Sequence, residues 1–215
     1  MVRNCWMSVR ISLAALVSIA SLAAAEELAR PGSIKPEDLK EYASLDGLRK
    51  RIVDESLDLA AKDSWLKYQF GSADPDSGGL DCSGAVFYIL ERVGVDPPRS
   101  SAAQFTWVKD EKSLTEVSVS VTSTGDAAFK DLKPGDLLFW SGTYEPIDGR
   151  TVPVSHVQIF LGHEKSTGDP VMVGSSDGRT YRGTKRGGYG VFDFKLPKPG
   201  SKAKFLGYGL PKISD

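Results

Sequence analysis

The chain has 215 residues, of which 40% are hydrophobic, so it is long enough and apolar enough for one compact domain with a core. This composition excludes a chain that is disordered over most of its length. The formal net charge of -1, with lysine and arginine scattered along the sequence, argues against nucleic acid as a partner. We find no internal repeat.

The first 25 residues have the pattern of a secretory signal peptide. Arg3 and Arg10 supply positive charge, and residues 11 to 20 form an apolar run that is too short to span a bilayer. Three alanines at positions 23 to 25 then offer a cleavage site. We expect residues 1–25 to be removed, leaving an exported protein, periplasmic or extracellular, without stable membrane insertion. A permanent N-terminal anchor is the alternative.

Removal of this segment would leave Cys82 as the sole cysteine. Cys5 precedes the apolar run, so it does not look like a lipid-attachment cysteine. A protein with one cysteine cannot close an internal disulfide. The thiol of Cys82 is therefore an intermolecular partner, a small buried residue or a nucleophile.

Helical patterns dominate the first half of the remaining chain. Residues 26–60 read as an N-terminal extension: residues 26 to 36 as a linker, then a helix over residues 36 to 64 from its apolar spacing. Residues 61–215 are then expected to form the main domain. A loop at residues 71 to 79 precedes a second helix, which begins at Cys82 or Ser83 and stops near Gly94.

Strand patterns dominate the second half. Valines alternate with serine and threonine at residues 117 to 121. Further strands are predicted at residues 137–140, 155–161, 170–173, 190–194 and 204–208. Helices first and strands later predict an α+β fold with an antiparallel sheet. Residues 143 to 152 and 163 to 169 look like surface insertions, although the first of them could instead shape a substrate groove.

Cys82 lies where a glycine-rich loop becomes a helix. The unpaired N–H groups and the positive dipole end of a helix N-terminus favour a thiolate over a thiol, and could also stabilise an oxyanion. Asp81 is a good N-cap residue, a role that is compatible with substrate binding. The alternative for Cys82 is a small buried residue in a helix.

Two histidines are present, His156 and His163. Alternation on the predicted strand puts Val157, Ile159 and Leu161 on the core face and His156 on the other face. A neutral imidazole could take the proton of a nearby thiol, so His156 is the candidate base. His163 follows a glycine in a polar turn and is expected at the surface. One cysteine and two histidines match no usual zinc ligand set, so no metal is expected.

Four motifs together resemble the NlpC-type cysteine peptidases. They are Tyr68-Gln69-Phe70-Gly71, Asp81-Cys82-Ser83-Gly84, residues 132 to 139 (LKPGDLLF), and the strand from Ser155 to Gly162. Pro98-Arg99 with the following serines and Gln104 also matches the family. The resemblance covers roughly residues 60 to 180, in the family's order.

This resemblance implies a papain-like core, with the helix that begins at Cys82 packed on an antiparallel sheet. It implies a cysteine peptidase that hydrolyses peptide bonds in peptidoglycan stem peptides, often between D-glutamate and a diamino acid. Cys82 carries over as nucleophile and His156 as base, with no cofactor. Tyr68, Asp81 and Ser83 carry over as substrate-binding residues, although Tyr68 could simply pack against the helix.

The third catalytic position departs from the family pattern. The family usually has a polar residue there, and alignment puts Gly174 at that place. Ser176 shares a strand face with Gly174, so it is our substitute. Ser175 and Asp177 remain alternatives if the strand bulges or ends early, as do a water or a backbone carbonyl. The serines could also only shape a turn.

Three other functions remain open at this stage. A similar site could serve a cell-wall amidase that cuts between sugar and L-alanine, or an acyltransferase. The missing side chain at Gly174 also allows a catalytically weak or inactive module that binds cell-wall peptides or a partner protein.

Overall fold

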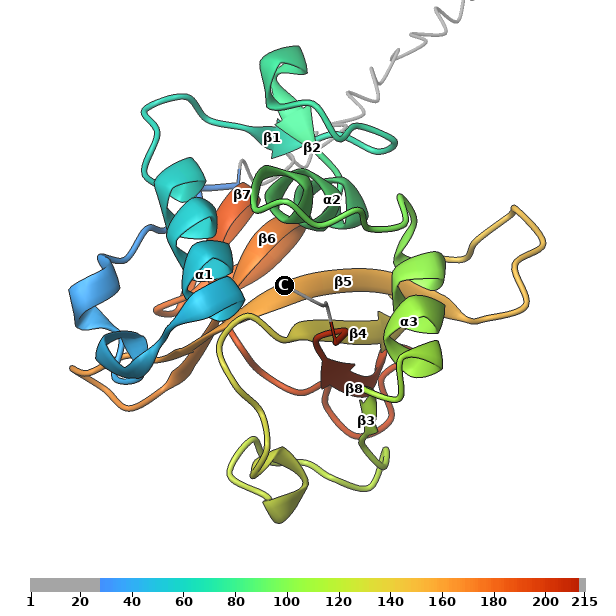
Figure 1. Ribbon diagram of the computed structural model, residues 1–215. Helices are drawn as coiled ribbons and strands as arrows, with labels where there is room; N and C mark the ends of the chain where they lie inside the picture. Colours follow the sequence, from blue (N-terminus) through green and yellow to red (C-terminus); the bar gives the residue numbers. More distant parts are fainter. Residues whose placement is uncertain (1–27, 213–215) are drawn as a thin grey trace, which may run out of the picture.

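The computed structural model describes residues 28–212, and the expected signal peptide lies outside the described residues. The predicted α+β class is confirmed, because helices pack against one antiparallel sheet (Figure 1). The α-helices are α1 (Gly47–Ala60), α2 (Cys82–Arg92) and α3 (Ser101–Asp110). None of the helices between residues 28 and 212 is both long and apolar enough to cross a membrane.

The six strands of the sheet follow the order β3-β8-β4-β5-β6-β7, and every neighbouring pair is antiparallel. They are β3 (Thr115–Glu116), β4 (Leu137–Ser141), β5 (Val154–His163), β6 (Pro170–Tyr181), β7 (Thr184–Asp193) and β8 (Lys204–Gly209). A separate parallel pair is formed by β1 (Lys67–Tyr68) and β2 (Gly79–Leu80). All five strands predicted after residue 136 are present, and β6 and β7 extend well beyond their predicted ends.

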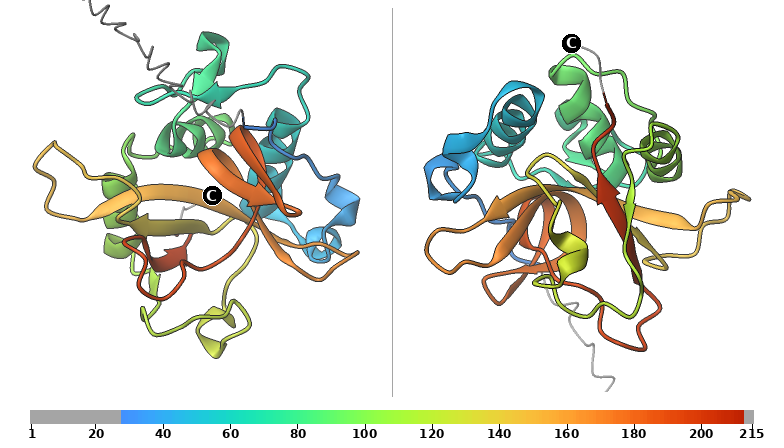
Figure 2. Two further views of the ribbon diagram at one scale, coloured as in Figure 1. Left: turned by 180° about the vertical axis from the view of Figure 1, so that it is seen from behind. Right: turned by 60° about the horizontal axis from the view of Figure 1, so that its bottom comes forward.

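The two faces of the sheet pack against different partners. Helices α1 and α2 lie on one side of it in both views of Figure 2. Val157, Ile159 and Leu161 face these helices, as the alternation on β5 predicted. The other face carries an aromatic cluster: Phe129, Trp140, Phe160, Phe192, Phe194, Phe205 and Tyr208. The strand of the candidate base is therefore buried on both faces.

The helix predicted over residues 36 to 64 is shorter than expected. Two short 3-10 turns precede α1, and Asp46 is extended before α1 begins. Leu39 is fully buried and forms a β-bridge with Glu164 in the β5–β6 turn. A tertiary contact thus overrides the helical spacing of the first half of this segment.

The predicted strand at residues 117 to 121 is wrong. Val117 still donates its N–H to Leu206, but the chain then turns, with Ser118 bonded to Ser120 and Val119 exposed. Serine side chains compete for the backbone and break the ladder. Helix α3 was not predicted, although Ser100 caps it by accepting the N–H of Ala103 at 3.2 Å.

Two segments that looked peripheral are packed against the domain. Part of the predicted linker runs along β7, where Ala29 bonds Gly187 and Gly32 bonds Val191 through the backbone. In the predicted insertion at residues 163 to 169, Glu164 is buried and accepts the hydroxyl of Tyr181 at 2.6 Å. The prediction of a surface insertion is therefore wrong at Glu164, because the carboxylate of this residue is buried in the turn.

Candidate active site

Cys82 is the first residue of α2, at the end of the glycine-rich loop. Asp81 caps the helix as predicted, since its carboxylate accepts the N–H of Gly84 at 2.6 Å. The helix packs on β5 and β6. Only 5% of the Cys82 surface is exposed, so the residue is buried where α2 meets the sheet.

The expected thiolate is not favoured in the free protein. Burial raises the pKa of the Cys82 thiol to about 11, and the negative charge of Asp81 adds to this rise. The backbone N–H groups of Val157 and Ser83 and the phenol of Tyr68 act in the opposite direction, but they do not outweigh burial. This direction is opposite to the depressed thiol pKa that the position at a helix N-terminus predicts.

His156 lies on β5 opposite Trp140 of β4, with ring centroids 5.8 Å apart. The thiol of Cys82 lies against the N–H of Val157, the next residue, so the helix end meets β5 at this histidine. The Nε2 atom of His156 is buried and has no hydrogen-bond partner among residues 28–212. Burial, followed by the positive charge of Arg179, holds the pKa of His156 well below its usual range. The imidazole is therefore neutral in the free protein.

Strand register separates the candidates for the third position. A Cβ added to Gly174 would lie 3.1 Å from Cγ of Gln158, so Gly174 faces Gln158. Ile159 pairs with Val173, and continuing that register brings Ser176 level with His156. Ser176 and His156 also line the same cavity. Geometry therefore keeps Ser176 as the candidate to orient the base.

Ser175 and Asp177, the alternatives on β6 for the third catalytic position, lie in different environments. Ser175 is fully buried, and its hydroxyl donates to the carbonyl of Leu80 at 2.5 Å. It therefore ties β6 to β2 on the helix side of the sheet. Asp177 is exposed but lines the same cavity as Ser176.

Asp81 and Ser83 form a network with Arg99. The guanidinium of Arg99 contacts both carboxylate oxygens of Asp81, at 2.9 and 3.2 Å, and donates to the hydroxyl of Ser83 at 3.0 Å. Gly71 also donates its N–H to Asp81 at 2.8 Å. These contacts fix the loop, the helix and Arg99 together.

Tyr68, on β1, is half-buried with its phenol against the thiol of Cys82. Burial, then the neighbouring charges of Cys82 and Asp81, raise the pKa of Tyr68 far above its usual range, so it stays protonated. Tyr68 therefore lies beside Cys82, where the family's first motif places it.

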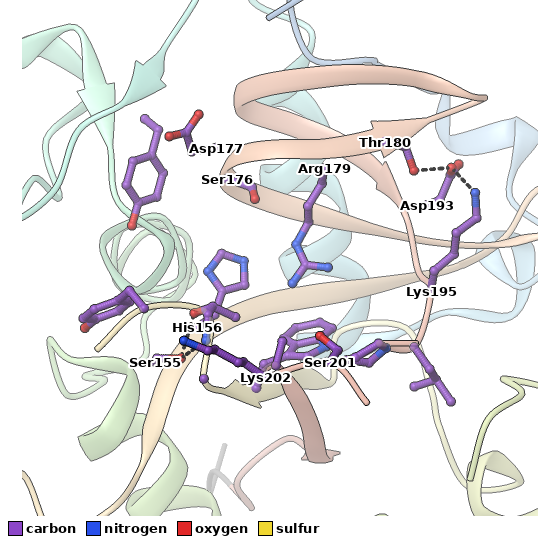
Figure 3. Close-up of a pocket in the computed structure, with 18 of the residues that line it drawn as sticks. Ser155, His156, Ser176, Asp177, Arg179, Thr180, Asp193, Lys195, Ser201 and Lys202 are labelled. Atoms are coloured by element: carbon purple, nitrogen blue, oxygen red, sulfur yellow. Dashed lines mark hydrogen bonds and ion pairs between the residues drawn. The ribbon is translucent and has the colours of Figure 1, made fainter. Parts of the chain in front are cut away.

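Cys82 and His156 open to different cavities. Cys82 lines a cavity of about 250 Å³ together with Asp81 and Arg99. His156 lines a larger cavity of about 800 Å³ (Figure 3). Tyr68, Phe70 and Tyr144 line both. A substrate that reaches both catalytic candidates would therefore straddle this aromatic wall.

The insertion at residues 143 to 152 forms part of that wall. Tyr144 packs edge-on against Phe70, with ring centroids 6.0 Å apart. Thr143 bonds Ser155 at 3.0 Å, and Arg150 donates to the carbonyl of Val154 at 2.7 Å. These contacts support the groove-shaping alternative for this loop over that of a neutral surface insertion.

His163 lies apart from this site. It ends β5, where its Nδ1 lies 2.6 Å from a carboxylate oxygen of Glu41. Its side chain is partly exposed, which fits the expected surface position, although it has a partner there. No group of three His, Cys, Asp or Glu side chains in the part of the chain that the structure describes could hold a metal ion.

Arg179 is a site residue that sequence reasoning missed. Period-2 alternation puts it on the face opposite Ser176, but β6 bulges between Asp177 and Arg179, where Gly178 has a φ of +92°. The bulge turns Arg179 toward the cavity, and its guanidinium lies 4.4 Å from the ring centroid of Trp140. Gly178 was the local signal for this reversal, because a glycine inside a strand often marks a bulge.

Comparison with known proteins identifies the family. The model of the NlpC/P60 family matches residues 66–184, which is more than half of the chain. The chain belongs to the NlpC/P60 family. This match, with α2 packed on an antiparallel sheet, confirms the predicted papain-like α+β fold.

Several relatives of this NlpC/P60 protein are named for hydrolysis. A gamma-DL-glutamyl hydrolase of Bacillus subtilis is 33% identical over 98 residues, 45% of this chain and 18% of that protein. A bifunctional muramidase/DL-endopeptidase of the same organism is 28% identical over 122 residues, 57% of this chain and 29% of that protein. A probable endopeptidase p60 of Listeria innocua is 28% identical over 126 residues, 58% of this chain and 20% of that protein.

The NlpC/P60 protein described here thus spans less than a third of these relatives. Among solved structures, a lipoprotein-like NLP/P60 protein from Staphylococcus aureus has a TM-score of 0.46 at 20% identity. That match covers 85% of this chain and 44% of the other.

Proposed function

We propose that this protein is a cysteine peptidase of peptidoglycan stem peptides, with Cys82 as nucleophile and His156 as general base. One observation carries the proposal: the thiol at the N-terminus of α2 lies against the N–H of Val157, directly after a buried, neutral His156. A thiol at a helix N-terminus and a neutral imidazole on the strand that this helix end meets are the two groups that general-base attack needs. Family membership and the endopeptidase names of two relatives support a peptidoglycan peptide as substrate.

The proposed reaction is acyl transfer to sulfur. His156 takes the thiol proton while the sulfur of Cys82 forms a bond to the stem-peptide carbonyl carbon. N–H groups in the first turn of α2 donate to the oxyanion. The C–N bond then breaks, and the leaving amine takes the proton from His156. Water, deprotonated by His156, attacks the thioester and releases the acid and the thiol.

We assign the surrounding residues to orientation and substrate contact. Ser176 acts through the imidazole of His156, so it is a positioning residue. Tyr68 contacts the substrate at the wall between the two cavities. Asp81 and Ser83 contact the amino end of the substrate in the smaller cavity, where Arg99 holds both side chains in place.

We propose that the scissile bond is the peptide bond that follows a γ-linked D-glutamyl residue. One relative is named a gamma-DL-glutamyl hydrolase and another a DL-endopeptidase. The proposed reaction needs no metal or organic cofactor, because a thiol, an imidazole and backbone N–H groups supply every proton transfer and charge contact.

We further propose export, with residues 1–25 as the signal peptide and the periplasm or exterior as the site of action. N-terminal sequencing of the protein recovered from the producing cell's envelope or medium tests this. Export predicts a new N-terminus at Glu26, whereas recovery of an intact N-terminus in the cytosol would contradict it.

Mass spectrometry of purified murein and stem peptides tests the activity. We expect the wild-type protein to release fragments whose masses place the cut after D-glutamate, and Cys82→Ala to release none. Fragments cut between sugar and L-alanine would identify an amidase, and transferred acyl groups an acyltransferase.

The binding module remains the second candidate, because Gly174 provides no side chain at the usual third position and the free thiol is not ionised. It predicts that neither wild type nor Cys82→Ala releases any product, while both bind murein equally. That outcome would reject the peptidase proposal.

A further inference from the structure

Gln158 lies on β5 two residues after His156, and its side chain is fully buried. Neither the nitrogen nor the oxygen of its amide has a hydrogen-bond partner among residues 28–212. A buried polar atom without a partner costs free energy, and an apolar side chain of the same shape would avoid that cost. The amide at this position therefore points to a polar group within its reach.

His156 supplies such a group. Val157 and Ile159 face the helices, so period-2 alternation puts His156 and Gln158 together on the opposite face of β5. Residues two apart on one strand are about 7 Å apart along it, a distance that a glutamine side chain and an imidazole can bridge. Nε2 of His156 is also buried and also lacks a partner in the part of the chain that the structure describes. Two unpartnered polar groups are thus neighbours on one buried face.

Gly174 makes room for the amide of Gln158. Continuing the register of β5 with β6 puts these two residues level with each other. A Cβ added to Gly174 would lie 3.1 Å from Cγ and 3.5 Å from Cδ of Gln158. The space into which a side chain at position 174 would project is therefore filled from β5. A polar group is present at the expected third catalytic position, but it comes from the neighbouring strand.

The buried ring nitrogen decides which tautomer the base needs. With Nε2 of His156 enclosed, Nδ1 is the nitrogen left to take the proton of Cys82, so the neutral ring has to carry its hydrogen on Nε2. An N–H in a buried site requires an acceptor. The amide oxygen of Gln158 is an acceptor with two lone pairs.

We propose that Gln158 is a positioning residue that fixes His156 as the Nε2–H tautomer, its amide oxygen accepting this N–H directly or through one bridging water. This inference rests on the proposed peptidase function and deepens it. Ser176 reaches the same imidazole from β6, at the edge of the larger cavity (Figure 3). Gln158 lines neither cavity, so it acts through His156 without touching the substrate.

Nuclear magnetic resonance of isotope-labelled histidine tests the tautomer without any substrate. The chain has two histidines, and His163 is an internal reference because its ring contacts Glu41 instead. We expect the wild type to hold the hydrogen of neutral His156 on Nε2. Gln158→Leu should shift His156 towards the Nδ1–H form or a mixture of both, while the signals of His163 stay unchanged. Gln158→Met, which keeps the length of the side chain, replaces the leucine variant if that variant does not fold.

Kinetics on a stem peptide provide a second readout. Gln158→Leu should lower kcat by about tenfold and leave KM unchanged, because the variant loses part of the general-base contribution and no substrate contact. Gln104→Leu is the matched control for the tautomer. Gln104 is also fully buried, but its amide donates to the carbonyls of Ser83 and Pro98 at 3.1 and 2.9 Å. It should leave the tautomer of His156 as in the wild type.

The two readouts separate this inference from the peptidase proposal. If the wild type cuts no stem peptide but Gln158→Leu still changes the tautomer, the peptidase proposal fails and the assignment of Gln158 stands. The assignment is overturned if wild-type His156 carries its hydrogen on Nδ1, or if the folded variant keeps the wild-type tautomer. An active enzyme that keeps its full kcat without the amide, or an equal tautomer change in Gln104→Leu, would overturn it as well.

Discussion

Cys82 shows how burial can reverse what a helix N-terminus predicts. The N–H groups of Ser83 and Val157 favour the thiolate, yet the pKa of the thiol is raised to about 11 because the sulfur is removed from water and Asp81 is adjacent. The resting pair is therefore thiol and neutral imidazole. In the proposed reaction, proton transfer then belongs to the attack step and does not precede substrate binding.

The rate at which iodoacetamide alkylates Cys82 measures the protonation state of the thiol. We expect a rate at pH 7 below that of a free cysteine, rising about tenfold per pH unit towards pH 10, because only the thiolate reacts. Urea-unfolded protein serves as the control and should react with an ordinary thiol pKa. A rate that is already high and constant below pH 7 would instead indicate a resting ion pair.

Two adjacent serines on β6 have separable roles. Continuing the register of β5 with β6 brings Ser176 level with His156, whereas Ser175 donates to Leu80 on the other face. We expect Ser176→Ala to lower kcat by about tenfold and to alter the pH profile of kcat/KM, with little change in stability. Ser175→Ala should instead cost about 1 kcal/mol of unfolding free energy, because it removes one of the two hydrogen bonds that the buried Leu80 carbonyl accepts, the other coming from the N–H of Gln69.

Urea unfolding and steady-state kinetics on the same stem peptide distinguish these outcomes. If Ser176→Ala keeps the wild-type kcat and pH profile, Ser176 does not position His156. A backbone carbonyl or water would then take that role.

At the scale of elements, the β6–β7 hairpin decides which side chains enter the larger cavity. The bulge at Gly178 interrupts the pairing of β6 with β7 between Asp177 and Arg179. Ser176 and Arg179 consequently line one cavity although they are three residues apart. Without a bulge, this spacing would put them on opposite faces.

Gly178→Ala tests the bulge. An L residue at a φ of +92° should cost about 1–2 kcal/mol in urea unfolding, and relaxation of the bulge should lower kcat/KM on stem peptides, because Ser176 and Arg179 would no longer line one cavity. Gly183→Ala is the control, since its φ is +77° at the hairpin turn and nothing lies near its added Cβ. It should lose similar stability but keep the wild-type kcat/KM. An equal loss of kcat/KM in both variants would count against the bulge as the cause.

At the scale of the whole molecule, the N-terminal segment is part of the folded unit. Residues 29 to 32 bond to β7, and Leu39 and Glu41 reach the β5–β6 turn. Gly32 makes the closest approach: an added Cβ would lie 2.1 Å from the ring of Tyr181. The hydroxyl of Tyr181 is in turn held by Glu164. The segment thus closes over the hairpin that presents Arg179.

Gly32→Ala should therefore destabilise the whole domain. We expect a loss of about 1–3 kcal/mol, seen as a lower Tm in a thermal melt, because the aromatic ring must move. Gly125→Ala, whose added Cβ would meet nothing closer than 3.6 Å, should leave the Tm unchanged. Equal melting temperatures for the two variants would mean that the N-terminal segment does not contribute to domain stability.

The sequence by itself determined the features that depend on neighbours along the chain. The Asp81 cap, the start of α2 at Cys82 and the faces of β5 follow from capping chemistry and period-2 alternation. The ordered motifs were enough to identify the family that the comparison then confirmed. These signals are local, so folding does not alter them.

Only the tertiary structure decided the features that depend on contacts across the fold. The protonation of Cys82 follows from how deeply α2 is buried, and Ser176 is matched with His156 by the register between strands. Arg179 enters the cavity because a bulge reverses its face. Burial and register arise from packing between distant segments, which no local pattern in the sequence records.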